Sequence, residues 1–530
     1  MQVHQIPLSD SGIYGKLMMD YIEGHPQLRP FYKYVPAIDS FPDVVKERSN
    51  FPFHREVLCA ELTDQHSRYF TEFPVLQQQI DFLKLENTFT VTTGHQPCVA
   101  GGPLYFLYKI ITTIRLAKSL NERYPEQKVV PVFWMGAEDH DLDEINSVFV
   151  FGKTVKWGTR QTGATGRMST EGMDTFVQEL ETLLGQEPFA ADVLEKLRKA
   201  YLGHSNLADA TREFVLQLFA SEGLLVLDAD RPSLKKIFAR IAREEVSTQA
   251  AFRIVNATSE KLGEHYKLQV NPREINLFYL DEQLRERIVL DEKGHYEIVH
   301  TDLEFTREFL IDLIDHQPER FSPNVILRPL YQEMILPNLA YIGGPGELAY
   351  WMQLKDMFEH YQASFPILVP RNNGLILPSR PLEKFQQLGF DKKDMFRSYD
   401  ELSKVWLSGQ ENLQDDIAKT TDAVKAAYDQ LAAAFAKTDP TLATSVQAEA
   451  QKVINGLDNL SKKGTAALKR KHEVALNQLK TLLDKVNPDD EPQERLVNFL
   501  QFYPKMGPEM IQVFLQEMNP LSFEMTVVVE

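Results

Sequence analysis

The chain has 530 residues, of which 43% are hydrophobic, and it carries a formal net charge of −18 at pH 7. This length exceeds that of one ordinary core and predicts two or three domains. The acidic balance argues against a protein that wraps nucleic acid, because such proteins usually present a basic face. Since Cys59 and Cys98 are the two cysteines, a disulfide framework and a zinc site of four thiolates are both excluded.

The first residues and the apolar runs predict where the protein is found. The opening stretch MQVHQIPLSDSGIYGK lacks a basic segment followed by an apolar one. It therefore does not resemble a secretory signal, and a cytoplasmic protein is expected. No apolar run in the sequence approaches the roughly 18 residues that a helix needs to cross a bilayer. We expect neither a membrane nor nucleic acid as a partner.

Apolar and β-branched runs mark the strands of the predicted core, in chain order. The first run covers residues 89–93, and a helical pattern follows it from 104 to 120. Further buried strands are predicted at 129–135, 223–230 and 365–372. Because helical segments separate these strands, the pattern predicts an α/β fold with a parallel sheet.

Two connections within the predicted core, residues 1–408, are too long for simple crossovers. We therefore expect inserted connecting subdomains at about 145–220 and 231–325. Within the second of them, residues 273–300 alternate between polar and apolar side chains, which is typical of a small antiparallel sheet.

Residues 409–487 are rich in Ala, Lys, Gln, Leu and Asp, with one break at 438–441. This composition predicts two long helices in an antiparallel coiled-coil hairpin. Apolar residues seven apart mark the predicted seam, namely Ile417, Val424, Leu431, Val446, Val453, Leu460, Ala467 and Val474. Because two helices alone bury little apolar surface, we expect the hairpin to form a homodimer with a second copy. Residues 488–530 return to apolar composition and are expected to pack on the core.

The stretch GHQPCVAGGP lies between the first strand and the helix after it. In an open parallel sheet, ligands bind beyond the carboxyl ends of the strands, where a helix N-terminus favours an anion. Gly94, Gly101 and Gly102 would let a ligand approach the backbone, while His95 and Gln96 would offer polar groups. The spacing fits neither a dinucleotide-binding motif nor a P-loop. A tight turn with a chance histidine is the alternative interpretation.

Acidic side chains crowd together after the second strand, in GAEDHDLDEIN. Glu138, Asp139, His140 and Asp141 have the chemistry to bind a cation, to accept protons from an amine nucleophile or to hold sugar hydroxyls. Side chains alternate along an extended segment, so either Asp139 and Asp141 or their neighbours Glu138 and His140 can face a ligand, but not both sets. The alternative is an acidic, solvated loop that caps the next helix.

Residues 327–355 again join an apolar segment to a glycine turn and a helix. Gly344 and Gly346 would allow a ligand to come close, whereas Glu347 would lie in the first turn of the helix, where capping alone explains a carboxylate. The candidates for holding a carboxylate or phosphate are Arg328, Arg371 and Asn372. Arginine suits this role because its guanidinium binds such groups in a fork, although surface solvation is the default for a single arginine.

The residue pattern alone limits the chemistry further. The histidines lie without partners at metal-ligand spacing, so no metal site is predicted, and no hydrolase or phosphotransferase motif occurs. The residues therefore predict an α/β enzyme with an anionic or sugar-like substrate and a dimerising coiled coil.

Four stretches, in this order, closely resemble the bacillithiol-biosynthesis cysteine-adding enzymes (BshC): TTGHQPCVAGGPLYFLYKI, PVFWMGAEDHDLDEIN, RPLYQEMILPNLAYIGGPGELAYW and ILVPRNN. The resemblance extends over essentially the whole chain. It implies a Rossmann-like core with inserted connecting segments and a dimerising coiled coil. It also implies a ligase that joins L-cysteine to the amine of glucosaminyl malate, the last step of bacillithiol biosynthesis.

The resemblance leads to a hypothesis for the roles of the site residues. One side chain of the run 139–141 would orient the sugar amine and accept its proton. The GHQP turn, with His95 as a further catalytic candidate and a helix N-terminus behind it, would hold the activated acyl group or its leaving anion. Arg328 or Arg371 would hold the malate carboxylates.

The sequence leaves the cofactor unknown. Amide formation from a carboxylate in water requires activation of the acid, for which either ATP or another activated donor would serve. Two other functions stay open as alternatives. One is a nucleotidylyltransferase or acyl-adenylate ligase acting on another small acid, and the other is a non-catalytic dimeric scaffold that binds a sugar or a nucleotide.

Overall fold

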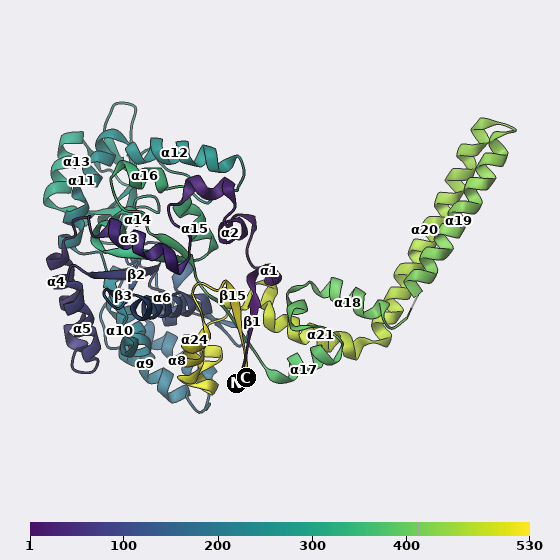
Figure 1. Ribbon diagram of the computed structural model, residues 1–530, viewed down its shortest axis with the longest axis horizontal. Coiled ribbons are helices and arrows are strands. Elements are labelled where there is room, and N and C mark those ends of the chain that lie inside the picture. The colour runs from purple at the N-terminus through teal and green to yellow at the C-terminus, as the bar shows by residue number, and fades with distance from the viewer. Residues whose placement is uncertain (412) are drawn as a thin grey trace. The chain divides into compact units, whose positions relative to one another are not determined.

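The structure is a computed structural model that describes residues 1–411 and 413–530 (Figure 1). The chain forms two compact units. The larger unit consists of Val3–Leu375 and Gln493–Val527, and the smaller consists of Met1–Gln2, Ile376–Pro492 and Val528–Glu530. Among the helices of the described residues, none combines the length and the apolar character needed to cross a bilayer.

A five-stranded parallel sheet lies at the centre of the larger unit, in strand order β13-β12-β2-β3-β6. Its strands are β2 (Thr88–His95), β3 (Lys128–Met135), β6 (Leu225–Asp228), β12 (Asn338–Gly343) and β13 (Ile367–Pro370). They are buried except at Lys128 and His95, which suits their β-branched and aromatic composition. The predicted parallel sheet is confirmed, and β12 adds a central strand where the sequence predicts only an apolar segment.

The register of the sheet brings the sequence motifs together. Gly94 of β2 lies opposite Trp134 of β3, and Gly343 of β12 lies opposite Pro370 of β13. The stretches that follow these four strands therefore leave the same edge of the sheet. Between β2 and β3, α6 (Leu104–Arg123) packs against both strands and confirms the predicted helix.

Helices of the N-terminal segment precede the sheet. They are α1 (Leu8–Ser11), α2 (Lys16–Ile22), α3 (Phe41–Arg48), α4 (Arg55–His66) and α5 (Pro74–Leu83). Strand β1 (Gln2–Pro7) forms a three-stranded sheet with β15 (Glu524–Val529) and β14 (Asn373–Leu377).

A buried ion pair anchors α3 to the start of β12. Arg48 pairs with Glu333 of α14 (Arg328–Ile335), and its Nε donates to the backbone oxygen of Asn338 at 2.6 Å. Asn338 in turn donates from Nδ2 to Glu333 Oε1 at 2.8 Å and accepts from Thr92 Oγ1 at 2.9 Å. All four polar side chains of this Arg48 network are fully buried. Because each charge has its partner there, the network fixes β12 in the middle of the sheet.

Two insertions interrupt the sheet connections. Between β3 and β6 lie α7 (Leu142–Ile145), β4 (Ser147–Val150), β5 (Lys153–Lys156), α8 (Met173–Leu184), α9 (Ala190–Tyr201) and α10 (Leu207–Phe219). Between β6 and β12 lie α11 (Pro232–Thr248), α12 (Ala250–Gly263), β7 (Leu277–Asp281), β8 (Leu284–Leu290), β9 (Tyr296–Ile298), β10 (Glu304–Phe305), α13 (Arg307–His316), β11 (Phe321–Pro323) and α14. The strands of this second insertion form an antiparallel sheet in the order β10-β9-β8-β7-β11, which confirms the sheet predicted at 273–300.

Short helices complete the larger unit. After β12 come α15 (Pro345–Met352) and α16 (Lys355–His360), and the C-terminal segment contributes α22 (Gln493–Leu496), α23 (Tyr503–Met506) and α24 (Glu509–Glu517). Both α22 and α24 contact α6. The boundaries predicted for the domains and their insertions remain predictions.

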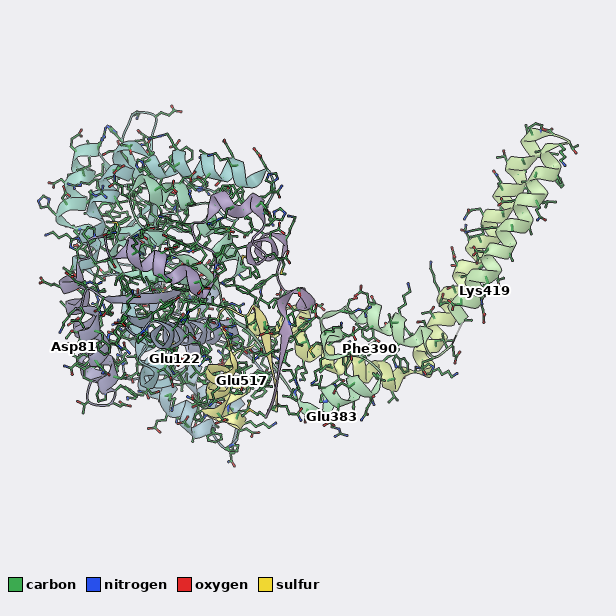
Figure 2. The ribbon with its side chains drawn as sticks, in the orientation of Figure 1. Asp81, Glu122, Glu383, Phe390, Lys419 and Glu517 are labelled. Atoms are coloured by element: carbon green, nitrogen blue, oxygen red, sulfur yellow. The ribbon has the colours of Figure 1, made fainter. Side chains whose placement is uncertain are left out.

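The smaller unit is helical. It contains α17 (Ser379–Gln387), α18 (Tyr399–Ser408), α19 (Leu413–Ala436), α20 (Pro440–Lys471) and α21 (Glu473–Val486). Helices α19 and α20 run antiparallel side by side, which confirms the predicted hairpin (Figure 1). Figure 2 shows their side chains, with Lys419 on α19.

The seam between α19 and α20 differs from the predicted one over part of its length. Gln414 on α19 bonds to Ser461 and Thr465 on α20, so this face of α20 is the one that packs against α19. Val453 and Leu460, which the spacing of seven predicts for the seam, are 39% and 58% exposed. The part of the apolar repeat that holds Val453 and Leu460 therefore lies outside the seam, whereas Ile417, Val424 and Val446 of the same repeat are only partly exposed.

Candidate active site

A cavity of about 730 Å³ lies in the larger unit, at the carboxyl ends of the strands. Several of the predicted site residues line it, namely Gly94, His95, Gln96, Glu138, Asp139, Arg328, Gly344, Gly346, Glu347 and Arg371. They come from the turns after β2, β3, β12 and β13 and from α14, so the parallel register brings together motifs that are far apart in the sequence.

Two glycines of the first motif do not line the cavity. Gly101 and Gly102 are buried with φ of 74° and 57°, a backbone conformation that favours glycine, and a Cβ at Gly102 would contact Cys98. Asn498 donates from Nδ2 to the backbone oxygen of Gly102. These glycines therefore shape the turn before α6 and do not face the cavity.

The start of α6 is also engaged by the protein itself. The backbone N–H of Leu104 donates to the oxygen of Val497 at 2.8 Å. The helix N-terminus at the cavity belongs to α15 instead, whose first turn contributes Gly344, Gly346 and Glu347 to the wall. An anion in the cavity would thus meet the partial positive charge of α15 and not that of α6.

Asn372, His140 and Asp141 also lie outside the cavity wall. Asn372 is buried and donates from Nδ2 to the oxygen of Asn519 at 2.8 Å. Asp141 is the N-cap of α7, and its side chain accepts from the N–H of Glu144 at 3.3 Å. Capping, which the sequence offers as the alternative for the acidic run, accounts for the observed contact of Asp141.

The imidazole of His140 holds an arginine from the inserted sheet. Arg285 of β8 donates from Nη1 to His140 Nδ1 at 2.6 Å, and its guanidinium lies 3.9 Å from the centroid of the Phe278 ring. Burial, followed by the charge of Arg285, lowers the pKa of His140. Arg285 lines the cavity, so the contact of His140 with the site runs through this cation.

Two carboxylates of the cavity wall share one amide donor. Gln96 Nε2 donates to Asp139 Oδ2 and to Glu144 Oε2, each at 2.8 Å. Asp139 Oδ1 also accepts from the N–H of His140 at 2.7 Å and lies 3.8 Å from Arg285 Nη1. We call Asp139 and Glu144 the Gln96 pair. The pair presents two carboxylates to the cavity, and such an arrangement is suited to bind an ammonium group and to accept its proton.

Glu138 is engaged in the wall behind this pair. Its Oε1 lies 2.6 Å from Lys235 Nζ, which also pairs with Asp230 at 2.7 Å. Burial raises the pKa of Glu138, whereas the charge of Lys235 lowers it. The carboxylate of Glu138 is therefore held by an internal cation.

A buried lysine joins the two glycine turns. Lys109 of α6 donates from Nζ to the oxygen of Gly94 at 2.7 Å and to Glu347 Oε1 at 2.8 Å. Glu347 also accepts from the N–H of Gly344 at 2.8 Å and from Tyr341 Oη at 3.0 Å. The charge of Lys109 and these hydrogen bonds outweigh burial and lower the pKa of Glu347. Glu347 thus caps α15, as the sequence allows, and ties it to α6.

Two arginines of the cavity wall, Arg371 and Arg328, differ in their partners. Arg371 Nη2 lies 2.7 Å from Glu494 Oε1, and both side chains are buried. Arg328 donates from Nη1 to Gln332 Oε1 at 3.0 Å and lies over the ring of Tyr341. Within the described residues, no carboxylate lies within 4.0 Å of the Arg328 guanidinium, so its charge is available to an anion in the cavity.

His95 is held as a neutral imidazole. Its Nδ1 donates to the backbone oxygen of Gln96 at 3.2 Å, and its Nε2 accepts from Tyr105 Oη at 3.2 Å. Burial, followed by the charge of Lys109, lowers its pKa to about 4. Cys98 Sγ lies 3.6 Å from His95 Nδ1, and burial raises the pKa of this thiol to about 12. The two groups are therefore not an ion pair of thiolate and imidazolium.

NMR titration of the His95 ring is expected to show a midpoint near pH 4, with the signal assigned by its loss in His95→Gln. The unfolded chain takes up this proton near pH 6.5. Folding stability therefore falls as the pH drops from about 6.5 towards 4, because only the unfolded state binds the proton in that range. A midpoint near 6.5 in the folded protein would contradict this assignment.

Several wall residues are not predicted from the sequence, namely Tyr105, Lys109, Arg285, Asn324, Tyr341, Tyr350 and Arg495. Lys109 could have been found from the sequence, because it is a charged residue within the apolar run YFLYKII of the predicted helix. Arg285 and Arg495 could not, because their strands and helices reach the cavity only through long-range packing.

Family models match nearly the whole chain. The model described as bacillithiol biosynthesis BshC, N-terminal Rossmann-like domain, matches residues 1–372, and that of the BshC C-terminal coiled-coil domain matches residues 374–530. A Flavobacterium johnsoniae protein named "Putative cysteine ligase BshC" is 38% identical over 524 residues, 99% of both chains. Proteins of the same name from Chlorobaculum tepidum and Bacillus cereus are 31% and 28% identical, over 90% and 99% of this chain and 89% and 98% of theirs. The expected Rossmann-like core and coiled coil are thereby confirmed.

Proposed function

The chain belongs to the bacillithiol-biosynthesis BshC family, and from this premise we propose that it is a ligase that joins the carboxyl group of L-cysteine to the amine of glucosaminyl malate. The reaction forms one amide bond. The cysteine carboxylate must be activated before the amine attacks, and ATP or another activated donor remains the predicted source of that activation.

One observation supports this proposal most strongly. A single cavity holds the Gln96 pair, Asp139 and Glu144, together with Arg328, whose charge has no carboxylate partner among the described residues. Glucosaminyl malate carries an amine and two carboxylates, so its charges complement both the carboxylates and the free guanidinium group of the wall. We assign the amine to the Gln96 pair and the malate to Arg328.

The chemistry follows from these assignments. Asp139 orients the ammonium group and accepts its proton, which leaves the neutral amine as the nucleophile. The first turn of α15 offers its helix N-terminus to the anion that leaves the activated acyl group. Neutral His95 contributes no charge to the reaction, because burial keeps its pKa near 4, and its Nε2 accepts the hydrogen bond of the wall residue Tyr105.

Mass spectrometry of the purified protein with glucosaminyl malate, L-cysteine and ATP tests the proposal, alongside a reaction without ATP. Amide product that depends on both substrates supports it, and dependence on ATP identifies the donor. A folded protein that binds glucosaminyl malate and forms no amide with or without ATP points to the nucleotidylyltransferase or acyl-adenylate alternative. Binding of a sugar or nucleotide without turnover of any acid points to the scaffold.

We also propose that the protein is a cytoplasmic homodimer that pairs through its hairpin. Within the described part of α19 and α20, only Ala432 and Leu468 are buried. Large apolar side chains stay exposed on the same two helices, namely Leu431, Phe435, Leu442, Val453 and Leu460. A face of this kind is typical of a helix that packs against a further helix, here from a second copy.

Leu460→Glu is expected to convert the dimer to a monomer at micromolar concentration, because it puts a charge into the apolar face. Light scattering measures the mass, and Asn459→Glu, which adds the same charge at the neighbouring exposed residue, is the matched control. A monomer mass for the unmodified chain would contradict the proposal.

A further inference from the structure

The C-terminal segment supplies two consecutive charged residues to the cavity region through the short helix α22. Glu494 is 2% exposed, whereas Arg495 is exposed and lines the cavity. The two side chains therefore have different surroundings although they are neighbours in the sequence.

Glu494 is fully engaged by the strand that leaves the sheet edge. Its Oε1 accepts from Arg371 Nη2 and from Asn373 Nδ2, each at 2.7 Å, and its Oε2 accepts from the N–H of Gly374 at 3.2 Å. These contacts hold α22 beside the end of β13. They also compensate the charge of Arg371, so this arginine is not a free cation for a ligand.

The other cations of the cavity wall also fall into two groups, those with a nearby carboxylate and those without one. Lys109 pairs with Glu347, and Arg285 lies 3.8 Å from Asp139. Arg328 and Arg495 are the wall cations for which the described residues supply no carboxylate within 4.0 Å. The cavity therefore keeps two uncompensated guanidinium groups, which is the charge needed for a ligand with two anionic groups.

We infer that Arg495 is a specificity-determining residue, which together with Arg328 selects a substrate bearing two carboxylates. Glu494 is its positioning residue, because its hydrogen bonds to β14 fix the place at which Arg495 meets the cavity. This inference deepens the proposed function and rests on it, since it assigns the malate end of the substrate to a cation from the C-terminal segment in place of Arg371.

Calorimetric titration of the full-length chain with L-malate and with L-lactate tests the inference. The two 2-hydroxy acids differ in the second carboxylate. The unmodified chain is expected to bind malate with a dissociation constant about tenfold or more below that for lactate, because one charge-assisted hydrogen bond changes the affinity by about this factor. Arg495→Gln is expected to abolish the preference by weakening malate alone. Arg160→Gln, at an exposed arginine outside the cavity wall, is the matched control and should retain the preference.

Three results would overturn the inference. They are equal affinity of the unmodified chain for the two acids, binding of neither acid, and an Arg495→Gln chain that still prefers malate. The proposed ligase activity fails separately, because its test is amide formation. Malate selectivity that depends on Arg495, in a protein that forms no amide, would retain the dianion site and reject the ligase.

Discussion

Asp139→Asn is expected to lower the rate of amide formation by about a hundredfold or more, which is the usual effect of removing a group that takes up a proton during the reaction. Asparagine has nearly the same shape, so an acceptor for Gln96 can remain while the negative charge is lost. The ammonium group would then lack both the charge that orients it and the base that deprotonates it. Mass-spectrometric initial rates with glucosaminyl malate and cysteine measure the effect.

Asp141→Asn is the matched control for this prediction. Asp141 caps α7 and does not line the cavity, and asparagine is an equally good N-cap, so its rate should stay close to that of the unmodified chain. Equal losses in the two variants would show that the whole acidic run acts as one unit. Full activity of Asp139→Asn would remove Asp139 from the mechanism.

Arg48→Leu is expected to lower the free energy of unfolding by about 3–5 kcal/mol, because it leaves the Glu333 carboxylate buried without its cation. The hydrogen bond to the backbone of Asn338 is lost as well, so the start of β12 is released. Urea unfolding, followed through the fluorescence of the buried Trp134 and Trp351 of the same unit, measures the change.

Two further variants separate the ion pair from the helix that carries it. Lys46→Leu changes an exposed cation on the same helix and should leave the midpoint nearly unchanged. The double variant Arg48→Leu with Glu333→Leu should recover part of the loss, because no unpaired charge remains. A single Arg48→Leu variant as stable as the Lys46→Leu control would contradict the role of the Arg48 network.

The sequence was sufficient for the elements whose pattern is local. The strand at 89–93 and the helix from Leu104 follow from apolar runs and from the glycine turn between them, and both are present. The predicted seam was wrong at Val453 and Leu460 because a repeat of seven identifies an apolar stripe but not which of two neighbouring stripes faces the other helix. Val453 and Leu460 lie on the stripe that α19 leaves uncovered.

The cavity was predictable to the extent that its residues follow strands of the parallel sheet. Gln96, Asp139 and Glu347 follow β2, β3 and β12, whose common edge is fixed by the topology, and all three line the wall. The hydrogen-bond and ion-pair partners of these side chains were not predictable, because they depend on packing between segments that are distant in the sequence. No local pattern indicates that Glu494 occupies Arg371 or that Arg285 engages His140. The catalytic and binding roles themselves remain predictions.

The surroundings of the two cysteines have a consequence for a protein proposed to process a thiol. Cys59 and Cys98 are both buried, and burial raises the pKa of each. Thiol–disulfide exchange requires an accessible thiolate, so neither residue is suited to attack an oxidised substrate or product. We therefore expect the protein to form no mixed disulfide with a small thiol under oxidising conditions.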